Sequence, residues 1–262
     1  MINWEYWYIF PASVIIAMTA NATGFSGGVF FQPFFYFGLN VPLINSIATG
    51  IATETLGMTS GAWRYAKQKM LDRTQITSLL LYIFLGVFLG LFVFSYLPAP
   101  WLRLIVGLVV FAVATYQMGL ALKNRFGFKT HLRPGFAKKY WLVFLSAGCF
   151  SACTGTGVAE VSQPMLEQKG KLTNLRANAT AVFLEACADW LISLFNLTWG
   201  NISLDVLLFS GTGVIIGAQL GAKYAYLLPA KLLKVVFSVA LLSVSLFYLY
   251  TFVVYLYPSS AL

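Results

Sequence analysis

The chain has 262 residues, of which 59% are hydrophobic and 10% are charged, and its formal net charge is +9. A soluble domain of this size needs a more highly charged surface, so the composition excludes a soluble protein and indicates one that lies in a lipid bilayer. The 17 lysine and arginine residues lie almost wholly in the predicted connections and at helix ends, which indicates membrane orientation and not nucleic-acid binding.

Long apolar runs predict an all-α polytopic membrane protein, since they lack the alternation of a barrel strand. Each half of the chain is predicted to hold a broken re-entrant helical hairpin followed by three transmembrane helices. In the first half, residues 1–123, these elements cover 7–42, 44–66, 75–97 and 101–123. In the second half, residues 140–262, they cover 140–170, 175–196, 204–226 and 231–257. A basic linker over 124–139 joins the halves.

The two halves are copies of one unit. Adding 131 to a residue number in the first half gives a matching residue in the second, as in Thr23/Thr154, Gly24/Gly155, Gln32/Gln163, Pro33/Pro164, Thr49/Thr180, Glu54/Glu185, Gly86/Gly217, Gly90/Gly221 and Pro98/Pro229. Internal repeats in a hydrophobic chain are typical of transporters, whose binding sites lie where the repeats meet.

The positive charges predict that the two repeats are inverted relative to each other. Lysine and arginine in short loops mark the cytoplasmic side of a membrane protein. If the first run of each repeat enters the membrane and turns back, every lysine and arginine except Arg103 faces the cytoplasm, whereas eight straight crossings would leave a weak bias. The central linker is therefore predicted to be cytoplasmic and both termini periplasmic.

Glycine clusters predict where the two hairpins break. As one helix, residues 7–42 would be about 54 Å long, which exceeds a roughly 30 Å hydrocarbon core. Three glycines fall within Gly24–Gly28, and the partner break lies at Thr154–Gly157. A half-helix that starts at such a break directs unpaired N–H groups and the positive end of its dipole toward the cavity, which favours an anion there.

A small-anion site is therefore predicted where the two breaks meet. Its substrate-binding residues are predicted to be Thr23, Gly24, Ser26, Gly27, Gly28, Gln32, Thr49, Thr154, Gly155, Thr156, Gly157, Gln163 and Thr180. The alternative is that the glycines of the breaks only allow close helix packing, as Gly86, Gly90, Gly217 and Gly221 are expected to do.

Four acidic residues fall within apolar segments, where an ionisable group needs a cavity or a partner. Glu54 and Glu185 are matched by the repeat, and Asp189 lies four residues after Glu185 on the same helix face. These three are predicted to couple transport to protons. The alternative is a structural role, with arginines at the helix ends as partners, and the role of Glu160 stays open.

The residues of the two breaks resemble those of the TauE/SafE family of sulfite and organosulfur-anion exporters. The resemblance covers nearly the whole chain and rests on Gly24-x-Ser26-Gly27-Gly28, Pro33 and Ala48-Thr49, repeated as Gly155-x-Gly157, Pro164 and Ala179-Thr180. The second break departs from the glycine-rich pattern with Val158, Ala159 and Glu160. The resemblance implies transport of sulfite, sulfoacetate or a taurine-like anion across the bacterial inner membrane.

These observations together favour a secondary transporter of a small anion that works by alternating access and couples to protons. A passive anion channel and a proton-coupled importer are the alternatives. No enzymatic activity, cofactor or metal is predicted, because His131 lies in a loop and Cys149, Cys153 and Cys187 fall in apolar segments. The substrate, the direction, the coupling ion and the oligomeric state stay open.

Overall fold

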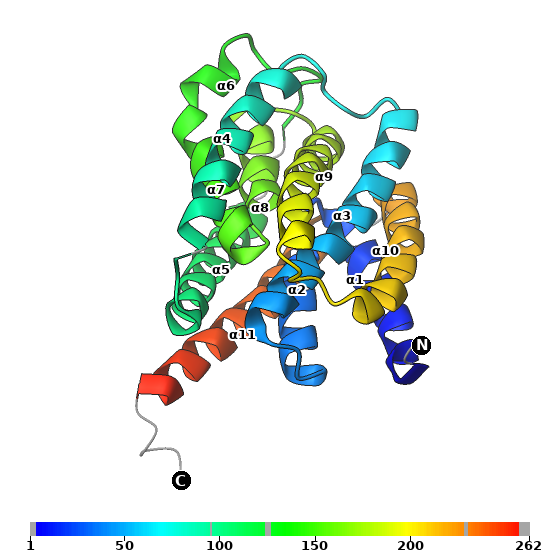
Figure 1. The fold of residues 1–262 in the computed structure, drawn as a ribbon. Helices are drawn as coiled ribbons and strands as arrows, with labels where there is room; N and C mark the ends of the chain where they lie inside the picture. The colour runs from blue at the N-terminus through cyan, green and yellow to red at the C-terminus, as the bar shows by residue number, and fades with distance from the viewer. Residues whose placement is uncertain (1–3, 95, 124–126, 228–229, 257–262) are drawn as a thin grey trace.

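The computed structural model describes residues 4–94, 96–123, 127–227 and 230–256, and most of these residues are helical (Figure 1). The first half contains α1 (Ile9–Thr23), α2 (Gly28–Pro33), α3 (Leu43–Lys67), α4 (Ile76–Phe94) and α5 (Ala99–Lys123). The second half contains α6 (Phe136–Lys139), α7 (Trp141–Thr154), α8 (Val158–Pro164), α9 (Asn174–Thr198), α10 (Leu204–Tyr224) and α11 (Ala230–Leu256). The all-α prediction is confirmed for this part of the chain, whose β structure amounts to one isolated bridge between Lys129 and Leu172.

Five of these helices are long and apolar enough to cross a membrane, namely α4, α5, α9, α10 and α11. The chain is therefore a multi-pass membrane protein. The predicted sixth crossing, α3, has 25 residues but is not among the five, because it carries a run of threonines and glycines together with Glu54. Its polar side chains between Thr49 and Thr55 are buried inside the protein instead of facing lipid.

Some predicted features lie outside the described residues. These are residues 1–3 of the first predicted half, position 95 of the predicted helix 75–97, positions 124–126 of the basic linker, Pro229 of the repeat and residues 257–262, which include the predicted end of the last helix. The division of the chain into two repeats that are inverted in the membrane stays a prediction.

Each half begins with a helix that is interrupted at glycine. α1 ends where Gly24 adopts a φ of 75°, and α7 ends where Gly155 adopts a φ of 65°. Residues with a Cβ rarely adopt this left-handed conformation, which explains why glycine stands at both positions. The short helices α2 and α8 follow, and each passes through a proline, Pro33 or Pro164, into one π-helical turn.

The two interrupted helices enter the molecule from opposite ends and return to the end where they began (Figure 1). Before α1, the ring of Tyr8 contacts that of Phe34, which follows α2, with centroids 6.5 Å apart. Before α7, the N–H of Phe128 donates to the carbonyl of Lys171, which follows α8, over 2.9 Å. Both segments are therefore hairpins whose breaks lie in the interior.

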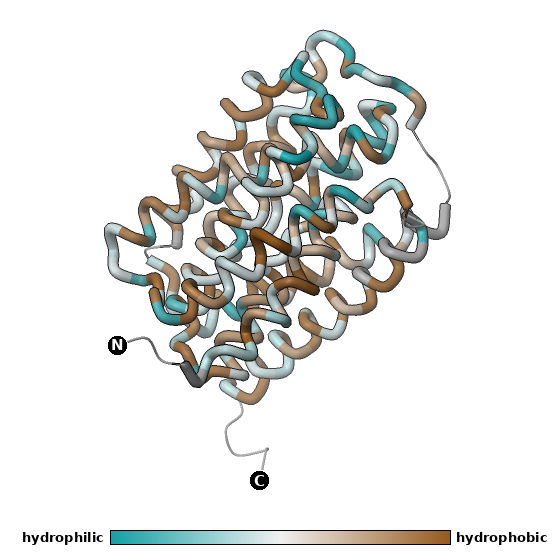
Figure 2. The backbone as a smooth tube through the Cα atoms, turned by 90° about the vertical axis from the view of Figure 1, so that its right-hand side faces the viewer, coloured by the Kyte–Doolittle hydropathy of each residue, from teal (hydrophilic) through white to brown (hydrophobic). Residues whose placement is uncertain are grey.

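Hydropathy is distributed unevenly along the molecule. Figure 2 shows hydrophobic residues along the length of the helices, with hydrophilic residues more frequent toward the end away from the start of α1. Lys67, Lys69, Arg73 and Arg176 line one hollow at that end. A basic end of this kind is what the predicted orientation requires of the cytoplasmic side.

The first helix of each half packs against the other half. α1 lies along α10 of the second half, and α7 lies along α4 of the first half. Four glycines allow these close approaches, because a Cβ at each would overlap with a main-chain carbonyl oxygen of the facing helix: Gly86 with Leu145, Gly90 with Cys149, Gly217 with Val14 and Gly221 with Met18. Their expected packing role is confirmed, and both sides of the two contacts are related by the offset of 131.

α3 and α9 meet at the centre of the protein and carry the hairpins. α2 packs on α3, and α8 packs on α9. The hydroxyls of Thr55 and Ser193 are 2.8 Å apart, and the indole N–H of Trp190 donates to the hydroxyl of Thr59 over 2.9 Å. Thr59 and Trp190 are themselves 131 residues apart, so equivalent positions of the two halves touch here.

Gly86→Val is expected to lower the free energy of unfolding by about 1–3 kcal/mol, because the added side chain separates α4 from α7. Gly217→Val is expected to have the same effect on α10 and α1. The midpoint of thermal unfolding of the purified protein in detergent measures both changes. Gly119→Val in α5 is the control, since nothing lies within 4 Å of a Cβ there; an unchanged midpoint for Gly86→Val would contradict the close packing.

Candidate functional site

The two breaks lie against each other in the interior of the protein. The side-chain amide of Gln32 in α2 donates to the carbonyl of Thr154 at the end of α7. The hydroxyl of Ser26 lies 3.3 Å from the carbonyl oxygen of Gly155. All of these residues are buried, so the structure brings predicted site residues of both halves together.

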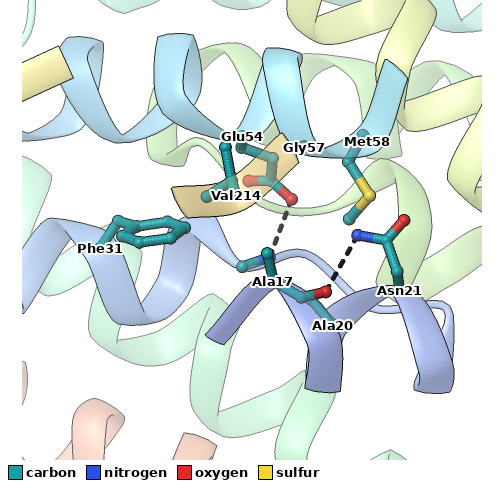
Figure 3. A pocket seen from close by; sticks show the side chains of 9 residues that line it. Ala17, Ala20, Asn21, Phe31, Glu54, Gly57, Met58 and Val214 are labelled. Carbon is teal, nitrogen blue, oxygen red and sulfur yellow. Dashed lines mark hydrogen bonds between the residues drawn. The ribbon is translucent and has the colours of Figure 1, made fainter. Parts of the chain in front are cut away.

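Glu54 reaches from α3 to the start of α2. Its carboxylate accepts hydrogen bonds from the N–H groups of Gly27 and Gly28, each over 2.8 Å, and from the hydroxyl of Ser26 over 2.6 Å. Figure 3 shows this carboxylate directed from α3 toward the break. A Cβ at Gly28 would overlap with the carboxylate oxygen, which is why glycine is required there.

Glu185 reaches from α9 to the start of α8 at the second break. Its carboxylate accepts hydrogen bonds from the N–H of Ala159 in α8 and from the hydroxyl of Ser151 in α7, the latter over 3.2 Å. Ala159 is the repeat partner of Gly28, as Glu185 is of Glu54. Each break therefore has an equivalent carboxylate on the helix behind it, which satisfies N–H groups that the break leaves without helical partners.

Glu160 joins the two breaks. One oxygen of its carboxylate accepts the N–H of Ser26 over 2.7 Å, and the other accepts the N–H of Gly157 over 2.8 Å. Ser26 and Gly157 are repeat partners, whereas the partner of Glu160 itself is Val29. Glu160 is thus a carboxylate without a counterpart, placed between equivalent amides of the two halves.

The sequence predicts that the amides of the breaks are unpaired. In the structure they are instead hydrogen-bonded to carboxylates. The carboxylates of Glu54, Glu160 and Glu185 accept these hydrogen bonds, and each of these side chains is at most 2% exposed. Among the described residues no lysine or arginine pairs with these acids, since the one ion pair there joins His131 to Asp72. The alternative of arginine partners at the helix ends is therefore not seen among the described residues, where no arginine forms an ion pair with these acids.

Asp189 completes a compact group of acids. Carboxylate oxygens of Glu54, Glu185 and Asp189 lie within 4.8 Å of one another. Asp189 is fully buried, and both of its oxygens lack a hydrogen-bond partner among the described residues. The repeat partner of Asp189 is Met58, which lines a small cavity together with Glu54 and Asn21 (Figure 3). The volume of this cavity is about 10 Å³, roughly enough for one water molecule.

Three of the predicted substrate-binding side chains bind elsewhere. The hydroxyl of Thr49 accepts the N–H of Ser203 over 2.9 Å, and that of Thr180 accepts the N–H of Asp72 over 3.1 Å. Both threonines therefore anchor connections that precede α10 and α4. The amide of Gln163 donates to Glu167 over 2.9 Å, in contrast to its partner Gln32, which crosses to the other half.

The remaining predicted hydroxyls lie at the breaks. Thr23 and Thr154 donate back to carbonyls of their own helices, which is a common use of threonine in membrane helices. Thr156 is 2% exposed and lies between Gly155 and Gly157. The structure adds Ser151 and Asn178, whose amide donates to the carbonyl of Ala22 over 2.9 Å. Ser151 has Ala20 as its repeat partner, so the duplication offers no signal for it.

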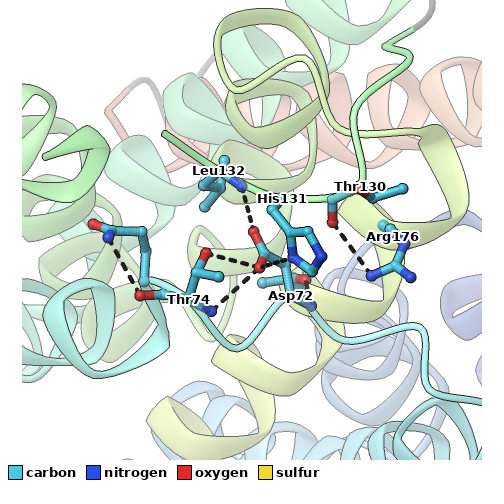
Figure 4. Close-up of polar contacts among 8 residues, drawn as sticks. Asp72, Thr74, Thr130, His131, Leu132 and Arg176 are labelled. Carbon is cyan, nitrogen blue, oxygen red and sulfur yellow. Dashed lines mark hydrogen bonds and ion pairs between the residues drawn. The ribbon is translucent and has the colours of Figure 1, made fainter. Parts of the chain in front are cut away.

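A second polar region lies at the basic end of the molecule. A hollow of about 460 Å³ is lined by Lys67, Lys69, Arg73, His131 and Arg176. Arg176 donates to the carbonyl of Thr130 over 3.3 Å, which ties the start of α9 to the central connection (Figure 4). Two described stretches of chain, residues 67–73 and the start of α9 at Arg176, therefore present lysine and arginine charge to one hollow.

Asp72 holds this region together. Its carboxylate accepts the N–H of Leu132 over 2.7 Å and the hydroxyl of Thr74 over 2.8 Å, and it lies 3.2 Å from the ring nitrogen of His131 (Figure 4). Burial by itself would raise the pKa of Asp72, but these hydrogen bonds outweigh burial and lower the pKa below its ordinary value. The ionised carboxylate thus fixes the central connection to the end of α3.

Comparison with protein families gives one match. The family model described as Sulfite exporter TauE/SafE matches residues 9–248, which includes both hairpins and all five candidate membrane spans up to the last turns of α11. No curated protein matches the chain significantly, and no solved structure does so either.

Asp72→Asn is expected to lower the free energy of unfolding by about 1–3 kcal/mol at neutral pH, because a buried set of donors loses its anionic acceptor. Since the pKa of Asp72 is lower in the folded state, its contribution is present above about pH 4 and is lost as the pH falls through the folded value. The difference in thermal midpoint between wild type and variant should therefore shrink at low pH. Asp205→Asn, at an exposed position, serves as the control; a gap that stays constant with pH would contradict the assignment.

Proposed function

We propose that this chain, which belongs to the sulfite exporter TauE/SafE family of membrane transporters, is a secondary transporter of a small anion. The substrates that fit best are sulfite and small organosulfonates such as sulfoacetate. Transport across the bacterial inner membrane would proceed by alternating access, with one half of the protein moving against the other around the two breaks.

The observation that carries this proposal is that the break amides bind oxyanions already. Main-chain N–H groups of Ser26, Gly27 and Gly28 in one half, and of Gly157 and Ala159 in the other, all donate to carboxylate oxygens. A sulfite or sulfonate group presents oxygens of similar size and charge. Helix starts with free amide hydrogens are general binding sites for such groups.

The charge distribution supports export from the basic end. With that end in the cytoplasm, the hollow lined by Lys67, Lys69, Arg73 and Arg176 would collect anions before they reach the breaks. The inside-negative membrane potential would then assist outward movement of an anion by about 2.3 kcal/mol per charge per 100 mV. Both termini would be periplasmic in this orientation.

Proton coupling is supported by the group of Glu54, Glu185 and Asp189. Three carboxylates within 4.8 Å of one another and without a cation among the described residues cannot all be ionised. The group therefore holds at least one proton. A change in its surroundings during the transport cycle would release or take up that proton, which couples the anion movement to the pH gradient.

A passive anion channel is the second candidate, and a proton-coupled importer of a small sulfur-containing anion is a variant of the first. A channel needs a continuous polar path, whereas the described residues enclose the breaks completely. Measured flux separates the two classes, since a channel would exceed transporter turnover and would ignore a pH gradient. The sign of the gradient response separates export from import.

Glu185→Gln is expected to weaken the effect of a pH gradient on sulfite and sulfoacetate flux into liposomes several-fold, because an amide cannot carry a proton and one of the coupled acids is lost. Gly27→Leu is expected to lower flux itself about tenfold or more, since a Cβ at Gly27 already lies 3.2 Å from the ring of Phe31. Flux of both anions is measured with and without the gradient. Asp205→Asn is the control, and unchanged flux in both site variants would show that the site is wrongly assigned.

Arg73→Gln is expected to slow anion uptake at the basic end a few-fold at low ionic strength, with a smaller difference at about 0.5 M salt, because screening removes electrostatic steering. Initial rates at several salt concentrations measure the effect. Arg133→Gln provides the matched control, since Arg133 is exposed on the central connection but does not line the hollow. A rate ratio that does not change with salt would argue against collection of anions there.

A further inference from the structure

We propose that Glu160 is an internal anion that occupies the substrate position between the two breaks, and that a substrate anion binds only after the Glu160 carboxylate is neutralised and withdraws. The inference rests on the proposed function and identifies how the same site is controlled. It assigns to Glu160 the exchange of a proton for an anion, a role separate from that of the acids on α3 and α9.

The first argument is the position of the carboxylate. The N–H of Ser26 and the N–H of Gly157 come from equivalent places in the two halves and point at one side chain, over 2.7 Å and 2.8 Å. Two convergent amides of this kind form an oxyanion site between equivalent positions of the two halves. Such a site is suited to a single small anion shared by both halves.

The second argument is that the duplication does not require Glu160. Glu54 and Glu185 are equivalent, and each binds the start of the short helix in its own half. Glu160 is matched by Val29, so the symmetric architecture would leave the amides of Ser26 and Gly157 to an external anion. A glutamate at only one of the two positions supplies one negative charge to that shared place.

A simple capping role explains only half of the contacts. Glu160 is the third residue of α8, and a glutamate at this position commonly accepts the N–H of the residue before the helix, here Gly157. Capping does not account for the bond to Ser26, which is 134 residues away in the other half. The carboxylate bridges the two halves and would have to release one or both when they move.

Among the residues that the structure describes, the charged groups that face Glu160 are all acidic. Glu54 on α3 and Glu185 and Asp189 on α9 interact with it electrostatically, and α5 contributes the neutral amide of Gln117, which donates to the Glu160 carbonyl over 3.1 Å. A substrate anion beside an ionised Glu160 would add negative charge to a buried group without a cation. Binding of a monovalent anion together with one proton on Glu160 leaves the total charge unchanged.

Binding of methanesulfonate to the purified full-length protein in detergent tests the proposal, because this probe stays a monoanion between about pH 5.5 and pH 8. Wild type should bind more tightly at the lower pH. Glu160→Gln should bind about tenfold or more tightly than wild type at about pH 8 and should lose most of the pH dependence. Glu160→Ala should show the same direction, and Asp205→Asn should behave like wild type. Size-exclusion profiles of all variants confirm that they are folded.

The outcomes separate this inference from the proposed function. If the Glu160 variants bind more weakly than wild type, or keep its pH dependence while still transporting sulfite, Glu160 is a structural bridge and the inference is overturned although the transporter stands. If wild type binds nothing but Glu160→Gln binds the probe, the blocking role is supported. If neither wild type nor any variant binds methanesulfonate or moves sulfite at any pH, the proposed function fails and the inference fails with it.

Discussion

The structure depends on hydrogen bonds between buried carboxylates and the main-chain amides of two interrupted helices. A helix that stops inside a membrane protein leaves N–H groups that water cannot reach, and such groups are costly unless they find acceptors. Glu54, Glu160 and Glu185 supply the acceptors. The acids in turn have no lysine or arginine partner among the described residues and depend on the amides. Breaks and carboxylates therefore stabilise each other, and neither could be buried alone.

The packing of the first helix of each half against the other half brings the breaks and the buried carboxylates together. Because α1 packs on α10 and α7 packs on α4, the first helix of each hairpin is held by the other half, whereas α2 and α8 pack on α3 and α9 of their own halves. The glycines of α4 and α10 set the distance of approach, and the meeting of α3 with α9 sets where the breaks face each other. Two acids depart from the duplication, since the repeat partner of Glu160 is Val29 and that of Asp189 is Met58. These departures place carboxylates where an exact duplication would place apolar side chains.

In the proposed transport cycle, the amides that the buried carboxylates occupy are also the groups that would bind the transported oxyanion. An external anion would then compete with an internal one, and a proton that neutralises a carboxylate would decide this competition. This view joins three features of the protein, namely the basic hollow near Arg73, the bridging position of Glu160 and the crowded acids around Asp189. In this proposal, each feature would act on the anion at a different stage of transport.

The sequence by itself determined the membrane class, the helical content, the duplication and the places of the breaks, because hydropathy, a constant offset and glycine conformation are local properties of the chain. It also identified the buried acids as unusual. Only the tertiary structure decided which amides these acids bind, since Glu160 meets Ser26 through the packing of one half on the other. Thr49 and Thr180 show the limit most clearly: they are matched by the repeat, yet their hydroxyls hydrogen-bond to the connections before α10 and α4 and not to the breaks. A repeat reports that two positions are equivalent, whereas their location depends on how helices far apart in the chain pack together.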